Sequence, residues 1–357
     1  MIRSAKLSLE FVTDKKRKMI FAILEAYRAA VNFYIEALWQ RGITKWDNEI
    51  FHSLVHTRLS ERYKTAALNQ AISVVMSTRE SVLVTGKTAT MPNFSGGRAT
   101  LDAKFVTIED GRGTFDLVIK LATLHKSRPI NIPTKRTEVL NKWLARPGAV
   151  LKQGCDLAED FVTLWVELPD EQPKETGNVL GIDINMNKLI VDSNGTVYGG
   201  DFKAVREKVC RRKPGSKGMK RARTERDHFI NRTVKQLPWN DLRALGVENL
   251  TGIKTGKRKG RTRAFRRARA PWTFRRVLNR VEMLAQENRV RLVPVQPAYT
   301  SRTYPSCSAA SKENRRGEYF RCICCGYKAD ADFVGAVNVL ARTQDTMGSL
   351  ESPMRTR

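Results

Sequence analysis

Three carboxylates in this 357-residue chain occupy positions where an acid is usually avoided. Asp183 closes the apolar run GNVLGIDIN, Glu248 closes LRALGVENL, and Asp332 opens the helical pattern DFVGAVNVLAR. An ionised side chain flanked by Val, Ile, Leu and Ala carries a desolvation cost unless a positive charge meets it. Two strand-end acids and one helix-start acid can converge on two hard divalent cations, an arrangement suited to in-line attack on a phosphodiester. The alternative is three unrelated surface acids.

The positive charge of the chain is concentrated in its second half. The formal net charge is +28, from 64 Lys and Arg against 36 Asp and Glu, and it divides into +7 for residues 1–170 and +21 for residues 171–357. Such an excess suits a nucleic-acid backbone. A membrane surface is the competing acidic partner, but the sequence has no window of about 18 apolar residues and no signal peptide. We therefore expect nucleic acid as the partner, with no membrane and no small-molecule substrate.

The cysteines indicate the compartment. Six cysteines are too few for a disulfide scaffold in a chain of this length, and four of them fall within residues 307–325. This usage predicts a reducing compartment.

The first half of the chain reads as a β domain interrupted by helices. An opening strand precedes apolar residues spaced three and four apart, which predict a long amphipathic helix over about residues 15–40, with further helices near 48–60 and 64–83. From about residue 90 to 170, short runs broken by Gly, Pro and Asn predict an antiparallel barrel or sheet. The polar stretch PDEQPKETGN then marks a domain boundary.

The second half alternates strands and helices. GNVLGIDIN, the hairpin KLIVDSNGTVYGG, a basic helix over about 202–236, LRALGVENL, PWTFRRVLNRVEMLAQENR and VRLVPVQP follow one another. This order predicts a mixed sheet with helices on its faces. The polar tail TQDTMGSLESPMRTR is expected to be disordered.

A run of bases without any acid follows Glu248 directly. We expect it to order on phosphate or to act as a flexible lid beside the acids, although a charge run can also be only a solvated face. A second basic block, residues 203–226, could add phosphate contacts that place nucleic acid without reading its sequence. The bases of the first run are Lys254, Lys257, Arg258, Lys259, Arg261, Arg263, Arg266, Arg267 and Arg269.

A cysteine knuckle precedes Asp332. Cys322 and Cys325 form a Cys-x-x-Cys followed by Gly, the turn that brings two thiolates onto one zinc. Cys307 supplies a third sulfur, but its expected partner position is Ala310, and Cys324 is a spare thiol. Either a three-sulfur zinc site or a degenerate knuckle held by backbone hydrogen bonds and packing fits this pattern.

The order of these motifs resembles the TnpB family, transposon-associated RNA-guided DNA endonucleases, and the compact type V CRISPR effector nucleases that share its RuvC-like domain. The resemblance covers residues 178–342 through GIDIN, VENLTGI with its basic lid, PAYTSRTYPSC, KENRR, FRCICCGY and ADADFVGAVNVL. The first 170 residues resemble the family only in layout.

The resemblance implies an α+β multidomain fold. It places an N-terminal wedge-like β-barrel domain at 1–14 and 90–170, a helical recognition insert at 15–89, and a linker at 171–178. It places a C-terminal RuvC/RNase H-like α/β domain at 179–299 and 329–342, with a zinc-ribbon-like target-nucleic-acid-binding knuckle inserted at 300–328, and a tail at 343–357.

The same resemblance makes Asp183, Glu248 and Asp332 the ligands of two Mg²⁺ ions bridged by Asp183, with Mn²⁺ able to substitute. Asp330 falls where the family usually has Asn, so the ligand role is assigned to Asp332. Arg315 or Arg316 of KENRR could neutralise charge on the reacting phosphate. Zn²⁺ is the cofactor implied for Cys307, Cys322 and Cys325.

Guide RNA and double-stranded target DNA are the implied partners, in the cytoplasm of a prokaryote and in association with the nucleoid when DNA is bound. This protein itself would read a short motif flanking the target. The N-terminal domain and its insert would contact that motif, with residues 15–18 as candidates, although those four bases can also serve only solubility. A nuclease-inactive RNA-guided DNA-binding repressor is the alternative function. A plain basic RNA-binding or assembly protein would explain the charge but not the placement of the acids.

Overall fold

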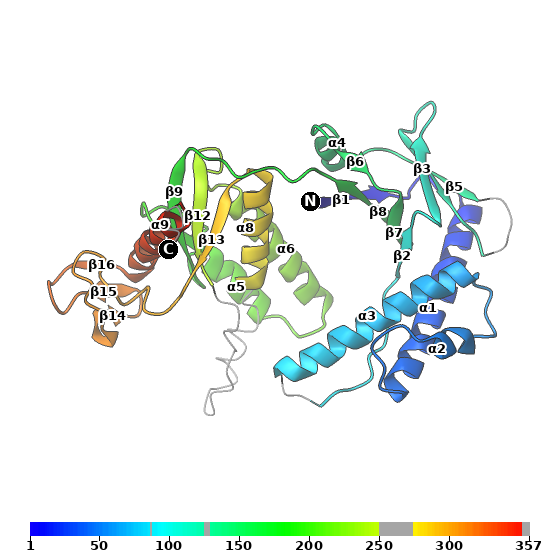
Figure 1. Cartoon of the computed structure of the whole chain (residues 1–357), viewed down its shortest axis with the longest axis horizontal. Helices are drawn as coiled ribbons and strands as arrows, with labels where there is room; N and C mark the ends of the chain where they lie inside the picture. The colour runs from blue at the N-terminus through cyan, green and yellow to red at the C-terminus, as the bar shows by residue number, and fades with distance from the viewer. Residues whose placement is uncertain (86–87, 125–128, 250–273, 352–357) are drawn as a thin grey trace, which may run out of the picture. The chain divides into compact units, whose positions relative to one another are not determined.

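The computed structural model describes residues 1–85, 88–124, 129–249 and 274–351. These residues form two compact units, Met1–Asp170 and Glu171–Arg357 (Figure 1).

In the first unit, three helices separate the first strand from the others. Strand β1 (Ile2–Ser8) is followed by α1 (Asp14–Gln40), α2 (Asn48–Ser53) and α3 (Glu61–Thr85). The remaining elements are β2 (Arg98–Asp102), β3 (Val106–Asp110), β4 (Leu117–Leu121), β5 (Ile130–Thr134), α4 (Glu138–Leu144), β6 (Val150–Leu151), β7 (Gly154–Ala158) and β8 (Phe161–Glu167).

The strands of this unit pair as two antiparallel sheets. One sheet has the order β1-β8-β7-β2 with β6 also on β8, and the other has the order β3-β4-β5. Residues of both sheets and of α1 and α3 belong to one hydrophobic core. The expected barrel is therefore two sheets on a common core, because alternation along a strand identifies its buried face but not its partner strand.

The second unit is built on a mixed five-stranded sheet, as the sequence predicted. The order is β11-β10-β9-β12-β13, with β9, β12 and β13 parallel and β10 antiparallel to β9. Its first elements are β9 (Asn178–Ile184), β10 (Ile190–Asp192), β11 (Val197–Tyr198), α5 (Phe202–Cys210), α6 (Lys217–Val234) and β12 (Leu242–Glu248). They are followed by α8 (Phe274–Glu287), β13 (Arg291–Val295), a short 3-10 turn η1 (Lys312–Asn314), β14 (Arg315–Arg316), β15 (Tyr319–Arg321), β16 (Lys328–Asp330) and α9 (Ala331–Glu351).

The two faces of this sheet bury different helices. Leu180 and Ile182 of β9 share a core with α5, α6 and α8. On the opposite face, Ala244 of β12 and Val293 of β13 pack with Val339 of α9. Because neighbouring residues of a strand point to opposite faces, residues 181 and 183 of β9 lie on the α9 face.

Two glycines let α9 lie very close to the sheet. A Cβ on Gly181 would come within 2.4 Å of the Ala336 carbonyl oxygen, and one on Gly246 would come within 1.9 Å of the Thr343 hydroxyl oxygen. Any side chain at either position would push the helix outward.

Two expectations for helix bounds were wrong. The basic helix expected over 202–236 is two helices, α5 and α6, because Pro214 and Gly215, which has a φ of 78°, fall between them. The tail expected to be disordered from residue 343 continues α9 to Glu351, because Thr343 and Met347 are buried one helical turn apart. Residues 352–357 lie outside the described part.

Within the described ranges, no helix combines the length and apolar character needed to cross a membrane.

Candidate active site

Asp183 and Glu248 end neighbouring parallel strands at the same level. The register pairs Ile182 of β9 with Val247 of β12, so the acid that follows each of them is carried to the same edge of the sheet. Both side chains are half-buried and lie on the α9 face. Each acid follows one of the two close-packing glycines by two residues. The glycine and the acid therefore lie on the same face of the strand.

Asp332 reaches the same face from the first turn of α9. The residue is 3% exposed. Asp330, two residues earlier, has another task, since its Oδ1 accepts hydrogen bonds from the backbone N–H groups of Asp332 (2.9 Å) and Phe333 (3.4 Å). Asp330 thus caps the helix as an Asn also could, which leaves Asp332 as the acid that faces the site.

The Asp183 carboxylate lies over α9 close to Asp332. Its Cγ would be 3.5 Å from a Cβ on Gly335, which lies one turn after Asp332. The charges of Glu248 and Asp332 both act on Asp183, so the three acids predicted from sequence lie near one another.

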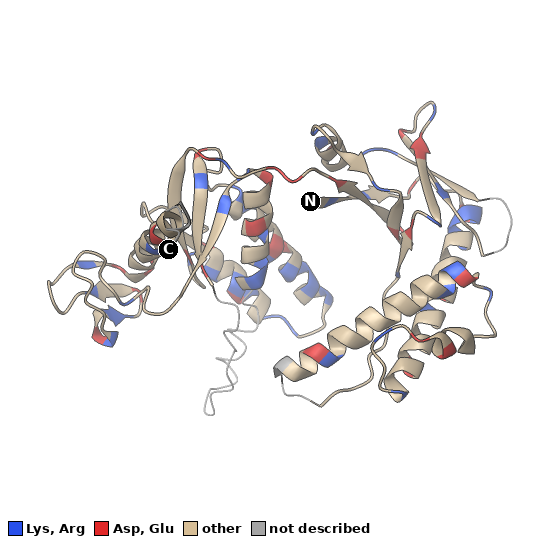
Figure 2. Ribbon diagram, viewed as in Figure 1, with Lys and Arg blue, Asp and Glu red and all other residues tan. Residues whose placement is uncertain are grey.

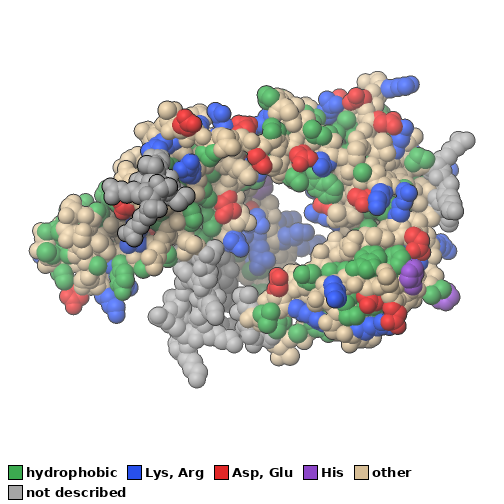
Figure 3. Space-filling view, in the orientation of Figure 1, with side chains coloured by type: hydrophobic (Ala, Val, Ile, Leu, Met, Phe, Trp, Pro, Cys, Tyr) green, Lys and Arg blue, Asp and Glu red, His purple; other side chains and the backbone are tan. Residues whose placement is uncertain are grey.

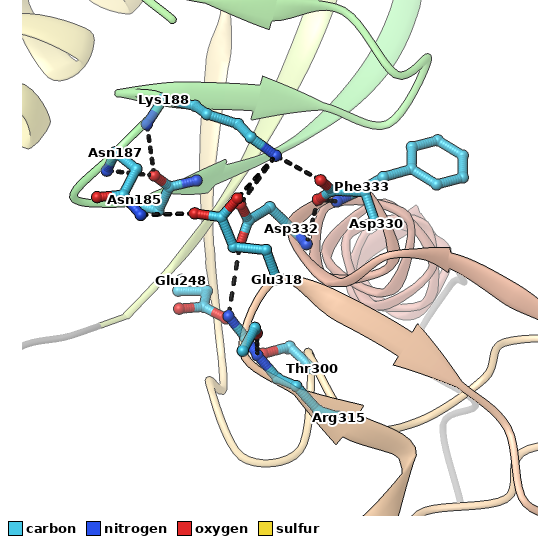
Figure 4. Close-up of polar contacts among 11 residues, drawn as sticks. Asn185, Asn187, Lys188, Glu248, Thr300, Arg315, Glu318, Asp330, Asp332 and Phe333 are labelled. Atoms are coloured by element: carbon cyan, nitrogen blue, oxygen red, sulfur yellow. Dashed lines mark hydrogen bonds and ion pairs between the residues drawn. The ribbon is translucent and has the colours of Figure 1, made fainter. Parts of the chain in front are cut away.

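Two cations flank Asp332 (Figure 4). Arg315 Nη2 is 3.4 Å from Asp332 Oδ1, and Lys188 Nζ is 3.6 Å from Asp332 Oδ2. Lys188 also pairs with Asp330 and with Glu318, the latter at 3.8 Å. Of the two arginines of KENRR, Arg315 contacts the acids, whereas Arg316 is exposed.

Burial raises the pKa of all three acids. Burial, and then the charges of Glu248 and Asp332, raise the pKa of Asp183 to about 8, against the opposing effects of Arg315 and Asn185. Burial also raises the pKa values of Glu248 and Asp332, and the charge of Asp330 adds to the latter. A site that holds carboxylates against their preferred charge state gains free energy when a cation binds.

The chemistry of the donors fits a hard divalent cation. All three groups offer carboxylate oxygens, the ligands that Mg²⁺ and Mn²⁺ prefer. Their oxygens are more widely spaced than the cysteine sulfurs, which form the one group among the described residues with all ligand atoms within 4.8 Å of one another.

Loop contacts that the sequence did not reveal hold Glu248 in place. The Thr300 hydroxyl, on the connection after β13, donates a hydrogen bond to Glu248 Oε1. The amide of Asn338 on α9 donates to the carbonyl oxygens of Thr300 and Thr303, each at 2.7 Å, which fixes that connection to the helix. The repeated Gly-x-acid ending was a readable signal for the close approach of α9. Lys188 and Thr300 had none, because they reach the site through loops.

The three predicted cysteines come together. Cys307 Sγ is 3.5 Å from Cys322 Sγ and 3.8 Å from Cys325 Sγ. A hydrogen bond from the Cys325 backbone amide lowers the pKa of the Cys322 thiol to about 7, which favours the thiolate that binds metal. Cys324 lies outside this cluster and is exposed.

Of the two basic segments, the structure describes only the second. The nine bases between residues 254 and 269 lie outside the described residues. The second block lies on α5 and α6, whose ribbons carry several Lys and Arg positions, coloured blue in Figure 2. Lys220, Arg221 and Arg223 of α6 are partly or fully exposed.

The comparisons with known proteins agree with the expected resemblance to compact type V effectors. Residues 274–339, from α8 into α9, match the Cas12f1-like TNB domain family. The chain is 26% identical over 292 residues to the CRISPR-associated endodeoxyribonuclease Cas12f2 of a Micrarchaeota archaeon, covering 69% of this chain and 54% of that protein. It is 32% identical over 69 residues to Cas12f1 of Sulfoacidibacillus thermotolerans, covering 19% and 16% respectively.

A solved structure shares the fold. The Cas12f1 chain of a cryo-EM complex with sgRNA and target DNA superposes with a TM-score of 0.54 at 15% identity, covering 92% of this chain and 82% of that chain. The predicted resemblance to TnpB-like and compact type V nucleases is therefore confirmed. The chain spans about half the length of the Cas12f2 relative.

Proposed function

We propose that this chain is an RNA-guided DNA endonuclease that hydrolyses phosphodiesters at a RuvC-type site. The observation that carries the proposal is the placement of Asp183, Glu248 and Asp332 on one face of the sheet, beside Arg315. The relatives named above are a CRISPR-associated endodeoxyribonuclease and an effector solved with sgRNA and target DNA. From these names we take DNA as the substrate class proposed for this chain.

Asp183, Glu248 and Asp332 are the residues that would hold Mg²⁺. The bound ions would supply Lewis-acid activation of a water and stabilisation of the leaving oxygen. No side chain of the chain needs to act as a nucleophile.

The surrounding residues orient the acids. Thr300 fixes one oxygen of Glu248, and the Asp330 cap fixes the first turn of α9 and with it Asp332. Arg315 lies beside Asp332 and neutralises negative charge that builds on the reacting phosphate. This role predicts a loss of rate, without a loss of DNA binding, when the guanidinium is removed.

The basic segments hold the nucleic acids. The bases between residues 254 and 269, which lie outside the described residues, would contact phosphate, and a guide RNA would open the duplex by pairing with one strand. The basic surface of α5 and α6 contacts phosphate, and the first unit reads the flanking motif. The cysteines Cys307, Cys322 and Cys325 bind zinc beside the site.

The test is cleavage of a matched DNA target by the chain with the RNA that co-purifies with it, with and without Mg²⁺. Metal-dependent, target-dependent cuts support the endonuclease. Guided DNA binding with no cut at any concentration of Mg²⁺ or Mn²⁺ would instead identify a nuclease-inactive repressor. We favour the enzyme because all three carboxylates are present and lie near one another.

A further inference from the structure

The cysteine cluster lies in a small subdomain with its own core. Phe320, Cys322, Ala331 and Val334 are buried together, and the rings of Tyr304 and Tyr327 stack on each other with centroids 4.2 Å apart. The subdomain lies at the left of the view in Figure 3, where hydrophobic side chains are visible at the surface. Cys307 and Cys325 are exposed, whereas Cys322 is 1% exposed. Two of the three sulfur-bearing residues therefore face solvent.

A buried amide holds the two halves of the knuckle together without a fourth cysteine. Asn314, 1% exposed, donates to the carbonyl oxygens of Arg302 and Ala309, each at 2.9 Å. Its Oδ1 accepts from the backbone N–H of Ile323 at 2.9 Å. Asn314 thus bridges the loop that carries Cys307 and the turn between Cys322 and Cys325, so the three sulfurs are held in place by the protein frame.

The fourth position of the knuckle is filled by a group that cannot bind metal. Ala310, where the sequence pattern expects the fourth ligand, pairs through its backbone with Thr303 and offers only a methyl group. Among the residues that the structure describes, no His, Asp, Glu or further Cys joins the three sulfurs. The three sulfurs therefore lack a fourth protein ligand within the described part of the chain.

Two exposed cations lie on the hairpin that precedes and follows the Cys322–Cys325 turn. They are Arg321 and Lys328, which lie directly opposite each other on β15 and β16. The cysteine cluster itself would carry a net charge of about −1 with a divalent cation, because each of three thiolates contributes one negative charge.

We propose that this knuckle is an open zinc site, in which Cys307, Cys322 and Cys325 hold the ion and one coordination position stays available to an exchangeable ligand. Water occupies that position at rest, and small nitrogen or sulfur donors such as imidazole or a thiol can replace it. Structural zinc sites are closed by four protein ligands, whereas three-ligand sites keep a position for an external molecule. The inference rests on the zinc binding included in the proposed function and is independent of the carboxylates.

The experiment uses the full chain loaded with Co²⁺ in place of Zn²⁺, with metal content and the cobalt absorption spectrum as readouts. We expect about one metal ion per chain that is absent from Cys322→Ser, and a change of the d–d bands when imidazole is titrated in. Ala310→Cys should give the spectrum of a four-thiolate site, lose the response to imidazole, and slow the loss of metal to a chelator. These readouts do not depend on DNA cleavage, so their outcome is independent of whether the chain is a nuclease.

Two further variants keep the test decisive. Cys324→Ser should leave the metal content and the imidazole response unchanged, and Cys322→Ser should lose the metal. A wild-type chain that binds no metal while retaining its thermal transition would overturn the proposal, since the frame would then be a degenerate knuckle. A wild-type spectrum that ignores imidazole, or one that changes in Cys324→Ser, would overturn it as well, because a fourth protein ligand would be present.

Discussion

Gly181 of β9 lies directly under Ala336 of α9, so close that a Cβ at Gly181 would be 2.4 Å from the Ala336 carbonyl oxygen. This close approach sets the distance between the helix that carries Asp332 and the strand that carries Asp183. The glycine is therefore part of the site although it has no side chain.

Gly181→Ala should separate α9 from the sheet. We expect a loss of stability of about 1–3 kcal/mol from overpacking, and a larger proportional loss of cleavage than of DNA binding, because the acids move apart. Thermal melting and a cleavage assay measure the two effects. Gly348→Ala on the same helix is the control, since nothing lies within 4 Å of its Cβ position, and it should be neutral or slightly stabilising. Equal melting temperatures for both variants would show that the close approach does not matter.

Asp183→Ala should abolish cleavage and leave guided DNA binding intact. We expect the rate of cutting to fall at least about a hundredfold, by analogy with the loss of one stabilising group from a reaction centre, because one of three oxygen ligands is removed. Binding is measured by gel shift with the guide RNA present. A parallel loss of binding would contradict the ligand role.

Asp332 and Asp330 should respond differently to the same change. Asp332→Asn removes a charge that faces the site and should stop cleavage. Asp330→Asn keeps the helix cap, because Asn and Asp cap about equally well, and should cut DNA within a few-fold of the wild type. The reverse order of activities would move the ligand role to Asp330.

Stability of the metal-free chain should fall as the pH rises through the raised pKa of Asp183. A carboxyl whose folded-state pKa lies above its unfolded value contributes stability that is complete below the unfolded pKa and is lost as the pH approaches the folded value, here about 8. Asp183→Asn cannot ionise and lacks this loss, so its melting temperature should exceed that of the wild type by more at about pH 8 than at about pH 5. Mg²⁺ should reduce this difference in melting temperature, because it stabilises only the wild type. A difference in melting temperature that stays constant with pH would contradict the burial of the Asp183 charge.

Shortening the basic run between residues 254 and 269 should weaken DNA binding and flatten its dependence on salt. The slope of log affinity against log salt should fall by about 0.9 for each duplex phosphate that the protein no longer neutralises, and by about 0.7 for each phosphate of a single strand. Binding titrations over a range of salt concentrations give the slope. A weaker affinity with the same slope would mean that these bases do not touch phosphate.

The sequence predicted the parts of the site that depend on local pattern. Apolar runs ending in Asp183 and Glu248 identified the strand ends. The choice of Asp332 over Asp330 rested instead on the family resemblance and stays a prediction, and the structure gives Asp330 the helix cap. Lys188 could not be predicted, because its approach to Asp332 depends on the turn after β9. The partition of the first unit into two sheets, and the continuation of α9 past residue 343, depend on which distant surfaces pack together.

Arg315 belongs to the hairpin of the cysteine subdomain, yet its guanidinium lies against Asp332 at the start of α9. In the proposed nuclease, a strand of DNA that shifts this hairpin would also shift a positive charge beside the carboxylates. Substitutions in the hairpin that are meant only to alter DNA affinity should therefore alter the rate of cleavage too.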